Sequence, residues 1–227
     1  MSKQDMSKNL TSINSLCSVL EFSGEGVISF LNNLLVSDLP KLNQNQLYYS
    51  ALCNPKGRII SSVFLCINNK TNALLFCPQN MASNLLQFFT MRKFRLKFSI
   101  ALVDALQPPN NSLAKILTAQ TFDGFYLALF DKNLPWIDAN NTEKHIPQHV
   151  NLDQHDDIMS FTKGCYPGQE IIARLKYLGK IKKRMVTVSN KSKAELTKEK
   201  TLISPIIKIE NSHYIAQKIG ASDCVPI

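Results

Sequence analysis

The sequence predicts an α+β fold with antiparallel sheets, and three observations support this prediction. Apolar residues make up 44% of the 227 residues and charged residues 19%, an ordinary balance for a globular protein with a substantial core. The expected elements follow one another as strand, strand and helix rather than as a strict strand–helix alternation, which favours antiparallel pairing. The chain also contains no internal repeat, so a solenoid or a propeller is not expected.

The first part of the chain is expected to form a strand, a helix and a hairpin. Residues 16–22 alternate loosely between apolar and polar side chains, as a strand does. Residues 46–53 and 58–67 are predicted strands, and Asn54-Pro55-Lys56-Gly57 between them has the composition of a turn. Between the first strand and the hairpin, apolar side chains recur at helical spacing on one face: Val27, Phe30, Leu31, Leu34 and Leu35.

The segment from residue 73 to residue 103 is predicted to form strand, helix and strand. Residues 73–77 are apolar, and Pro78 suits the first turn of a helix that follows. In the expected strand 92–103, alternate positions are aromatic or apolar and basic. The basic side chains Lys93, Arg95 and Lys97 would form either an ordinary solvent-facing surface or a track for phosphate groups.

The remaining elements are predicted from shorter signals. Pro108 to Asn111 indicates a boundary, followed by a helix at 112–120, a strand at 125–130 and an irregular segment from Pro135 to Asn151. Pro167 to Tyr177 is a predicted helix that ends at Gly179, and the β-rich runs after Arg184 suggest a small barrel or sheet. These elements divide the chain into an N-terminal α+β part (1–107), a second α+β part (108–177) and a small, truncated C-terminal β-barrel (178–227).

Composition excludes several classes of protein. No run approaches the roughly 18 uncharged apolar residues of a membrane span, and the polar start of the chain resembles neither a secretory signal nor a transit peptide. We therefore expect a cytoplasmic protein without membrane contact. The six cysteines form no CxxC pair and the four histidines no HExxH motif, so reduced thiols and no dedicated metal site are expected.

The net charge of +9 is concentrated in the last third of the chain. Residues 1–159 carry 13 Lys and Arg against 12 Asp and Glu, whereas residues 160–227 carry 13 against 5. Local basicity of this kind can select anionic partners. We interpret Lys191 to Lys200 as a solvated surface, while Lys176 to Arg184 is equally consistent with a solvated surface and with an anion-binding surface.

Cys165 is the residue that the local pattern singles out. It follows Lys163 and Gly164 and lies just before a predicted helix that begins at Pro167. The positive end of the helix dipole and the Lys163 ammonium would both favour the thiolate, so we expect its pKa to fall from about 8.5 to roughly 7 or below. The alternative, equally consistent with the pattern alone, is a glycine-rich helix entry with a buried, inert cysteine.

Lys163 to Arg174 reads KGCYPGQEIIAR and resembles, over its full span, the motif K-G-C-Y/F-x-G-Q-E-x-x-A-R of the YgfZ-type family. IPQHVNL at Ile146 to Leu152 and NPKGR at Asn54 to Arg58 resemble two further blocks of the family in the same order. The resemblance covers residues 16–184. It implies the fold of the glycine cleavage T-protein: two ferredoxin-like α+β parts and a small C-terminal β-barrel around a central folate channel.

The resemblance also implies a function and a set of site residues. Family members are folate-binding accessory proteins that support maturation or repair of iron–sulfur enzymes, including those that modify tRNA. The cofactor would be tetrahydrofolate or a derivative, and the partners iron–sulfur client or assembly proteins. Cys165 would be the functional thiol, with Lys163 beside it. The matched positions give the predicted folate-binding residues: Asn54, Lys56, Arg58, Phe125, Tyr166, Gly168, Gln169, Glu170 and Arg174.

Two differences from characterised relatives bear on this prediction. Cys17 and Phe125 occupy positions at which relatives carry channel tryptophans, and the single tryptophan, Trp136, lies elsewhere in the alignment. Phe125 can stack on a pterin ring, whereas Cys17 cannot. Lys56, Arg58 and Arg174 are expected to contact the glutamate tail of the folate, although Lys56 and Arg58 are equally consistent with a charged hairpin tip.

Two other functions are considered. The first is tetrahydrofolate-dependent aminomethyl transfer, as in the T-protein itself. Aligning the 54–57 turn places Ser61 and Ser62 where that enzyme has an Asp pair, and serine cannot replace a carboxylate as a charge partner. The second is a basic module with weak tRNA contact, which is suggested by the charge of residues 160–227 alone.

Overall fold

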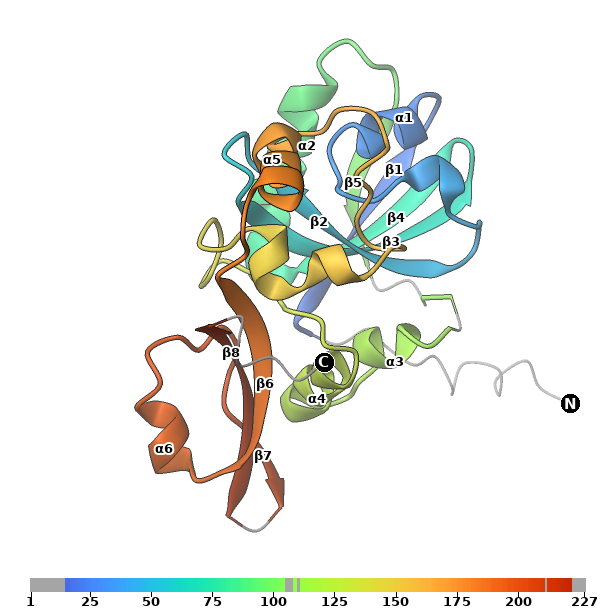
Figure 1. The fold of residues 1–227 in the computed structure, drawn as a ribbon. Coiled ribbons are helices and arrows are strands. Elements are labelled where there is room, and N and C mark those ends of the chain that lie inside the picture. Colours follow the sequence, from blue (N-terminus) through green and yellow to red (C-terminus); the bar gives the residue numbers. More distant parts are fainter. Residues whose placement is uncertain (1–14, 105–107, 110, 211, 222–227) are drawn as a thin grey trace, which may run out of the picture.

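The computed structural model describes residues 15–104, 108–109, 111–210 and 212–221 (Figure 1). Within these residues it contains two antiparallel sheets, one of five strands in the order β2-β3-β4-β1-β5 and one of three strands in the order β6-β8-β7. The strands are β1 (Cys17–Ser23), β2 (Leu47–Cys53), β3 (Ile59–Asn69), β4 (Asn72–Pro78), β5 (Ser99–Val103), β6 (Lys183–Lys191), β7 (Ile207–Glu210) and β8 (His213–Ala221). The α+β prediction is confirmed.

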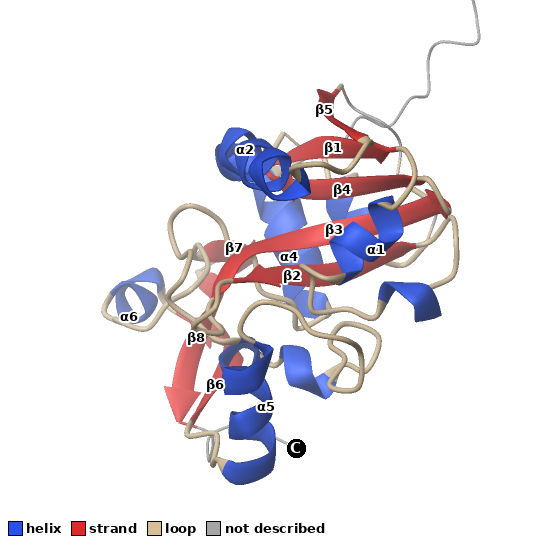
Figure 2. Ribbon diagram, turned by 90° about the horizontal axis from the view of Figure 1, so that it is seen from above, coloured by secondary structure: helices blue, strands red, loops and turns tan. Residues whose placement is uncertain are grey.

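Two helices cover one face of the five-stranded sheet, as the predicted apolar spacing requires. They are α1 (Val27–Asn32) and α2 (Ala82–Lys93), and the apolar cluster beneath them is rich in aromatic rings. Phe22 of β1 meets Phe89 of α2 edge to face at 5.2 Å between ring centroids, a favoured geometry for buried rings. Figure 2 shows α1 in front of the sheet and α2 at its side.

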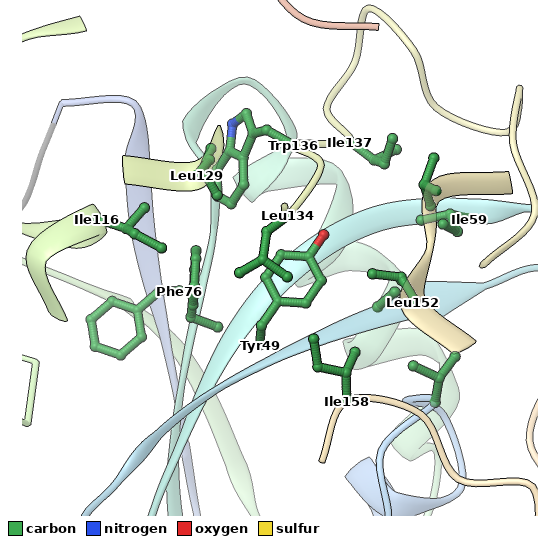
Figure 3. Close-up of a cluster of buried hydrophobic side chains, with 14 of the residues drawn as sticks. Tyr49, Ile59, Phe76, Ile116, Leu129, Leu134, Trp136, Ile137, Leu152 and Ile158 are labelled. Carbon is green, nitrogen blue, oxygen red and sulfur yellow. The ribbon is translucent and has the colours of Figure 1, made fainter. Parts of the chain in front are cut away.

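The opposite face of the same sheet is covered by two further helices and by an irregular segment. The helices are α3 (Ala114–Leu117) and α4 (Phe122–Asp131), and residues 134–159 contain only 3-10 turns. Their apolar side chains join those of the sheet in one buried cluster, which extends to Met185 and Ile207 of the second sheet. Figure 3 shows this cluster around Tyr49, Leu134 and Trp136. The inner strands are therefore covered on both faces, whereas the edge strand β5 stays largely exposed.

The C-terminal strands form an open sheet rather than the predicted barrel. β8 lies between β6 and β7, and no further strand joins them among the described residues. The short helix α6 (Lys193–Thr197) lies between β6 and β7 in sequence and begins with a capping box at Ser192 and Glu195. Most side chains of β6 are exposed or half-buried, so this strand contributes few side chains to the core.

Two predicted strands are wrong. Residues 125–130 lie in α4, where the Thr121 hydroxyl accepts a hydrogen bond from the Gly124 amide and starts the helix. Residues 92–98 continue α2 and then turn, because Phe94 adopts a φ of 37° and ends the helix. As a result Phe94 is 80% exposed instead of buried, and only residues 99–103 form the strand.

No helix among the described residues is long and apolar enough to cross a membrane. Cys224 lies outside the described residues.

Candidate functional site

The last long helix, α5 (Gln169–Leu178), begins directly after the cysteine motif. It starts two residues later than predicted: Pro167 lies in a turn before the helix, and Gly168 is the residue that precedes the first helical position, with a φ of 81°. Glycine adopts this left-handed conformation without the strain that other residues meet. Gly179 ends the helix, as the sequence predicts. We call residues 163–168 the thiol loop.

The thiol loop touches the 54–57 turn backbone against backbone. A side-chain carbon placed on Gly168 would lie 2.5 Å from the Asn54 carbonyl oxygen and 2.5 Å from the Gly57 Cα. Such distances are far inside van der Waals contact, so Gly168 can only be glycine here. Gly57, with a φ of 71°, packs in return against the Gly168 carbonyl and Ile172. Two motifs that lie more than 100 residues apart in the sequence therefore form one surface.

Lys163 fixes the other end of the thiol loop. Its ammonium is buried and donates hydrogen bonds to the backbone carbonyls of Asn32, Leu35 (2.5 Å) and Ser37 (2.7 Å), at the C-terminal end of α1 and just beyond it. A cation is favourable at the negative end of a helix dipole. Burial lowers the pKa of Lys163 to about 8, and Asp38 acts in the opposite direction. The structure thus gives Lys163 a positioning role, while its predicted effect on the thiol stays a prediction.

Cys165 lies between these two anchors and is exposed. The other described cysteines differ from it: Cys53, Cys66 and Cys77 are buried and Cys17 is half-buried. Burial raises the pKa of all four, to about 11 for Cys66 and about 12 for Cys77. The expectation of a buried Cys165 is therefore wrong, while the reactivity of its thiol stays a prediction. Among the described cysteines, Cys165 alone is open to a large partner.

The neighbours of Cys165 divide into buried and solvent-facing side chains. The Tyr166 ring is buried, its hydroxyl has no hydrogen-bond partner, and burial raises its pKa. The Lys163 ammonium lies 5.1 Å from the centre of that ring. Gln169 donates to the Lys163 carbonyl and so closes the loop. Glu170 and Arg174 are exposed, and among the ion pairs of the described residues none joins them.

The 54–58 turn is held by hydrogen bonds and lies among basic side chains. The Asn54 side-chain oxygen accepts hydrogen bonds from the amides of Lys56 and Arg58, and Arg58 donates to the carbonyls of Glu143 and Lys144. Next to these residues, burial and the positive charges of Lys144, Arg58 and Lys183, together with His149, lower the pKa of His145 to about 4. The Arg58 guanidinium is thus engaged within the chain, whereas the Lys56 side chain is exposed.

Phe125 is in the core. It is fully buried on α4, and its ring meets Trp136 edge to face at 5.0 Å. Trp136 therefore lies next to Phe125, the position at which relatives carry a channel tryptophan. Sequence alignment alone could not show this contact. No face of the Phe125 ring is open to a ligand in this arrangement.

Ser61, at the position aligned with the catalytic carboxylate of the T-protein, is fully buried and donates a hydrogen bond to the Ser62 carbonyl. Its neighbour Ser62, at the second position of the Asp pair, belongs to a closed hydrogen-bond network. Its hydroxyl lies 2.5 Å from the Tyr49 hydroxyl and accepts a hydrogen bond from the Ile137 amide. Tyr49 also donates to the Pro135 carbonyl. Both serines are fully buried, so the two aligned positions hold hydrogen-bonded neutral hydroxyls and no charge.

A cavity of about 570 Å³ opens beside Tyr49, at the edge of the first sheet. Its volume lies in the usual range for a site that takes a small organic ligand. The lining comes from four stretches of chain and includes two tyrosines, two basic side chains and several amides: Asn45, Gln46, Leu47, Tyr48, Tyr49, Asn111, Ser112, Leu113, Lys132, Leu134, His155, Asp157 and Ile158. No motif in the sequence indicates these residues.

A second hollow, of about 420 Å³, adjoins the first. The two share Tyr48 and Asp157 in their linings, and the second extends to Phe161 and Thr162, just before Lys163. None of the predicted site residues lines either hollow. Within the part of the chain that the structure describes, no group of three or more His, Cys, Asp or Glu side chains could hold a metal ion.

Comparison with known proteins supports the resemblance. No family model matches the chain. It is 26% identical over 217 residues to the tRNA-modifying protein YgfZ of Blochmanniella pennsylvanica (strain BPEN), which covers 71% of this chain and 66% of that protein. It is also 26% identical over 233 residues to the tRNA-modifying protein YgfZ of Hamiltonella defensa subsp. Acyrthosiphon pisum (strain 5AT), covering 77% of this chain and 68% of that protein.

Among solved structures, the glycine cleavage system aminomethyltransferase T from Bartonella henselae matches with a TM-score of 0.59 and 12% sequence identity. The match covers 93% of this chain and 79% of that one. At this identity the likeness shows the fold alone. The resemblance to YgfZ-type proteins and the T-protein-like fold are confirmed, and the matched region spans about two thirds of the length of the first YgfZ relatives.

Proposed function

We propose that this chain acts as the YgfZ-type proteins it resembles are expected to act: as a cytoplasmic, folate-binding accessory protein that supports maturation or repair of iron–sulfur enzymes, including tRNA-modifying ones. The observation that carries the proposal is Cys165, an exposed thiol on a loop that is anchored on both sides. A thiol that is only exposed needs no such anchoring. A thiol that must meet a partner in one orientation does, because misplacement of a reacting group is costly.

The arrangement limits what Cys165 can do alone. An iron–sulfur cluster usually takes four thiolates, and the other described cysteines are buried or half-buried. Cys165 would therefore act on a cluster or on a thiol that a second protein presents. Lys163 and Gly168 hold the loop in place, and Tyr166 fills the space beneath it.

We place tetrahydrofolate in the cavity beside Tyr49. The volume suits a ligand of this size, the half-buried Tyr48 offers a ring beside the pterin, and Lys132 and His155 offer donors for the glutamate carboxylates. The folate-binding residues predicted from the motifs lie outside this lining. They belong to the thiol-loop surface and to the core, so we assign Asn54, Gly168 and Gln169 to the shape of that surface instead.

Aminomethyl transfer is disfavoured as the function of this chain. The position aligned with the catalytic carboxylate holds Ser61, a fully buried residue whose hydroxyl donates to the Ser62 carbonyl. A neutral, buried hydroxyl cannot balance the charge of a folate amine.

The first experiment tests the thiol. In a strain that depends on this protein, the Cys165→Ser variant is expected to lose activity of an iron–sulfur enzyme and the tRNA modification that such an enzyme performs. The control is Cys17→Ala, which removes a half-buried thiol on β1 far along the chain. Full activity of the Cys165→Ser strain, with the protein present at wild-type level, would contradict the proposal.

The second experiment tests the folate site. Titration calorimetry with tetrahydrofolate is expected to give binding to the wild-type protein and about tenfold weaker binding, or none, to Ser112→Trp, which fills the cavity mouth. The control Ser189→Trp places the same ring on an exposed position of β6. Equal affinity of both variants would place the ligand elsewhere, and an absence of heat with all proteins would remove the folate proposal.

A further inference from the structure

Helix α5 carries an apolar stripe on its outer side. Ile171, Leu175 and Leu178 recur at positions i, i+4 and i+7, so they lie on one face of the helix. Ile171 is 48% exposed and Leu178 is 84% exposed, although both are large apolar side chains. The next residue, Ile172, is the one buried side chain of the helix, and both Ile171 and Ile172 approach Gly57 of the 54–57 turn. Figure 2 shows α5 at the edge of the molecule.

Basic side chains surround this stripe. Arg174 lies on the same face, Lys180 and Lys182 follow the helix, and all three are exposed. Within the described part of the chain, none of these three forms an ion pair or a hydrogen bond through its side chain. Residues 171–184 contain no Asp or Glu, and Glu170 at the start of the helix is the nearest acid in the sequence. We call Ile171, Leu175 and Leu178 with these three cations the α5 face.

We infer that the α5 face is the docking surface for the iron–sulfur client or assembly protein, and that the partner presents an apolar groove rimmed by carboxylates. This inference rests on the proposed function. A helix that offers apolar anchors at i, i+4 and i+7 is recognised by a groove on a folded protein. The unpaired cations supply charge complementarity and steer an acidic partner toward the site.

The α5 face directly follows the thiol loop in the chain, so a partner bound to the face is held close to Cys165. The thiol loop runs directly into α5, and Gly168 ties the start of this helix to the 54–57 turn. A partner seated on the stripe would therefore meet an exposed thiol at a fixed place, four residues before the helix begins.

Other occupants agree less well with these side chains. A second copy of the chain would bring one cationic face against another, in a protein with a net charge of +9. Single-stranded RNA is held by aromatic stacking as well as by charge, but the stripe is aliphatic, and Tyr177 already lies edge-on to Phe161 at 6.4 Å. A membrane-surface helix buries a broad apolar face, whereas α5 has only 10 residues and an apolar stripe of three side chains.

The test uses the full chain in the strain assay and in solution. Ile171→Glu combined with Leu178→Glu, and separately Leu178→Glu alone, are expected to abolish iron–sulfur enzyme activity. Because Leu178 is 84% exposed, its replacement should leave the free energy of unfolding unchanged. The matched control is Met91→Glu, a 71% exposed apolar residue on α2.

The solution measurement uses as its probe the purified iron–sulfur enzyme whose activity falls in the Cys165→Ser strain. Its affinity for Leu178→Glu, and for Lys180→Glu combined with Lys182→Glu, should be about tenfold weaker than for wild type. Binding unchanged by these substitutions would overturn the inference. The inference would also be overturned if Leu178→Glu instead removed another property of the wild-type protein. Those properties are dimerisation in sedimentation, retention of total tRNA and flotation with phosphatidylglycerol vesicles.

The two proposals fail differently. If the Cys165→Ser strain is fully active, the proposed function is wrong. If that strain is inactive while folded Leu178→Glu is active, the proposed function stands and the docking surface is wrong.

Discussion

The thiol loop and the cavity beside Tyr49 are built from different kinds of contact. The thiol loop is held by backbone atoms and one buried ammonium, through Gly168, Gly57 and Lys163. The cavity is lined by side chains from four stretches of chain, several of them half-exposed. A backbone contact as close as that at Gly168 leaves no room for any side chain, whereas a lining of side chains can vary while the hollow persists. A recognisable motif is therefore expected at the loop and not at the cavity.

The largest effect is expected at Gly168. Gly168→Ala places a carbon 2.5 Å from three backbone atoms of the turn and on a residue with a φ of 81°, so we expect a loss of about 3 kcal/mol or more in the free energy of unfolding. The matched control is Gly26→Ala, where φ is 86° but no atom lies within 4 Å of the added carbon. It should lose only about 1 kcal/mol. Urea unfolding measures both, and equal losses would show that the close contact is not what constrains Gly168.

A smaller effect is expected at Lys163. Lys163→Met leaves the carbonyls of Asn32, Leu35 and Ser37 without their donor, which should cost about 2 kcal/mol, the usual penalty for buried polar groups left unpaired. Urea unfolding against Lys180→Met, an exposed lysine, gives the comparison. A Lys163→Met protein as stable as the Lys180→Met protein would remove the anchoring role.

At the cavity, single contacts should matter less. Asn111 donates to the Leu47 carbonyl and accepts from the Leu113 amide, so it joins two sides of the lining. We expect Asn111→Ala to lower the free energy of unfolding by about 1.5 kcal/mol, because two partly buried hydrogen bonds are lost. Ser112→Ala, at the next position, is the control with no such contact. A cost at Asn111 that matches Gly168→Ala would contradict the contrast between the two regions.

The smallest effect concerns pH. The folded-state pKa of His145 is about 4, below its ordinary value of 6.5, so the folded protein prefers the neutral ring. Between these values the unfolded chain binds more protons, and stability falls as the pH is lowered from about 6.5 toward 4. Because His145 is only partly buried, we expect His145→Gln to reduce the loss of stability between pH 7 and pH 5 by about 1 kcal/mol. Identical pH dependence of the two proteins in urea unfolding would contradict this.

Local signals were sufficient for much of the fold. The hairpin around Asn54 to Gly57 and the end of α5 at Gly179 were predicted, because turn residues and helix stops act over a few positions. The segment after Lys93 was misread, because its alternation of aromatic and basic residues also occurs in a turn after a helix. Phe125 was misread in the same way, since a short apolar run does not distinguish a buried strand from a buried helix.

The candidate site was predictable only where it is local. The sequence identified Cys165 and the glycine after it, but not that Gly168 meets Gly57 or that Lys163 reaches Leu35. These contacts join residues more than 100 positions apart, and no single-sequence pattern reports them. The same holds for the cavity, whose lining is assembled from four distant stretches.

The anchoring of Lys163 has a consequence for the order of folding. Its carbonyl acceptors lie 126 to 131 residues earlier in the chain, and closing so long a loop costs entropy that must be offset by contacts already made. The thiol loop can take its shape only after α1 has docked on the first sheet. A newly made chain therefore presents no anchored thiol loop until residues 32–37 have folded into place.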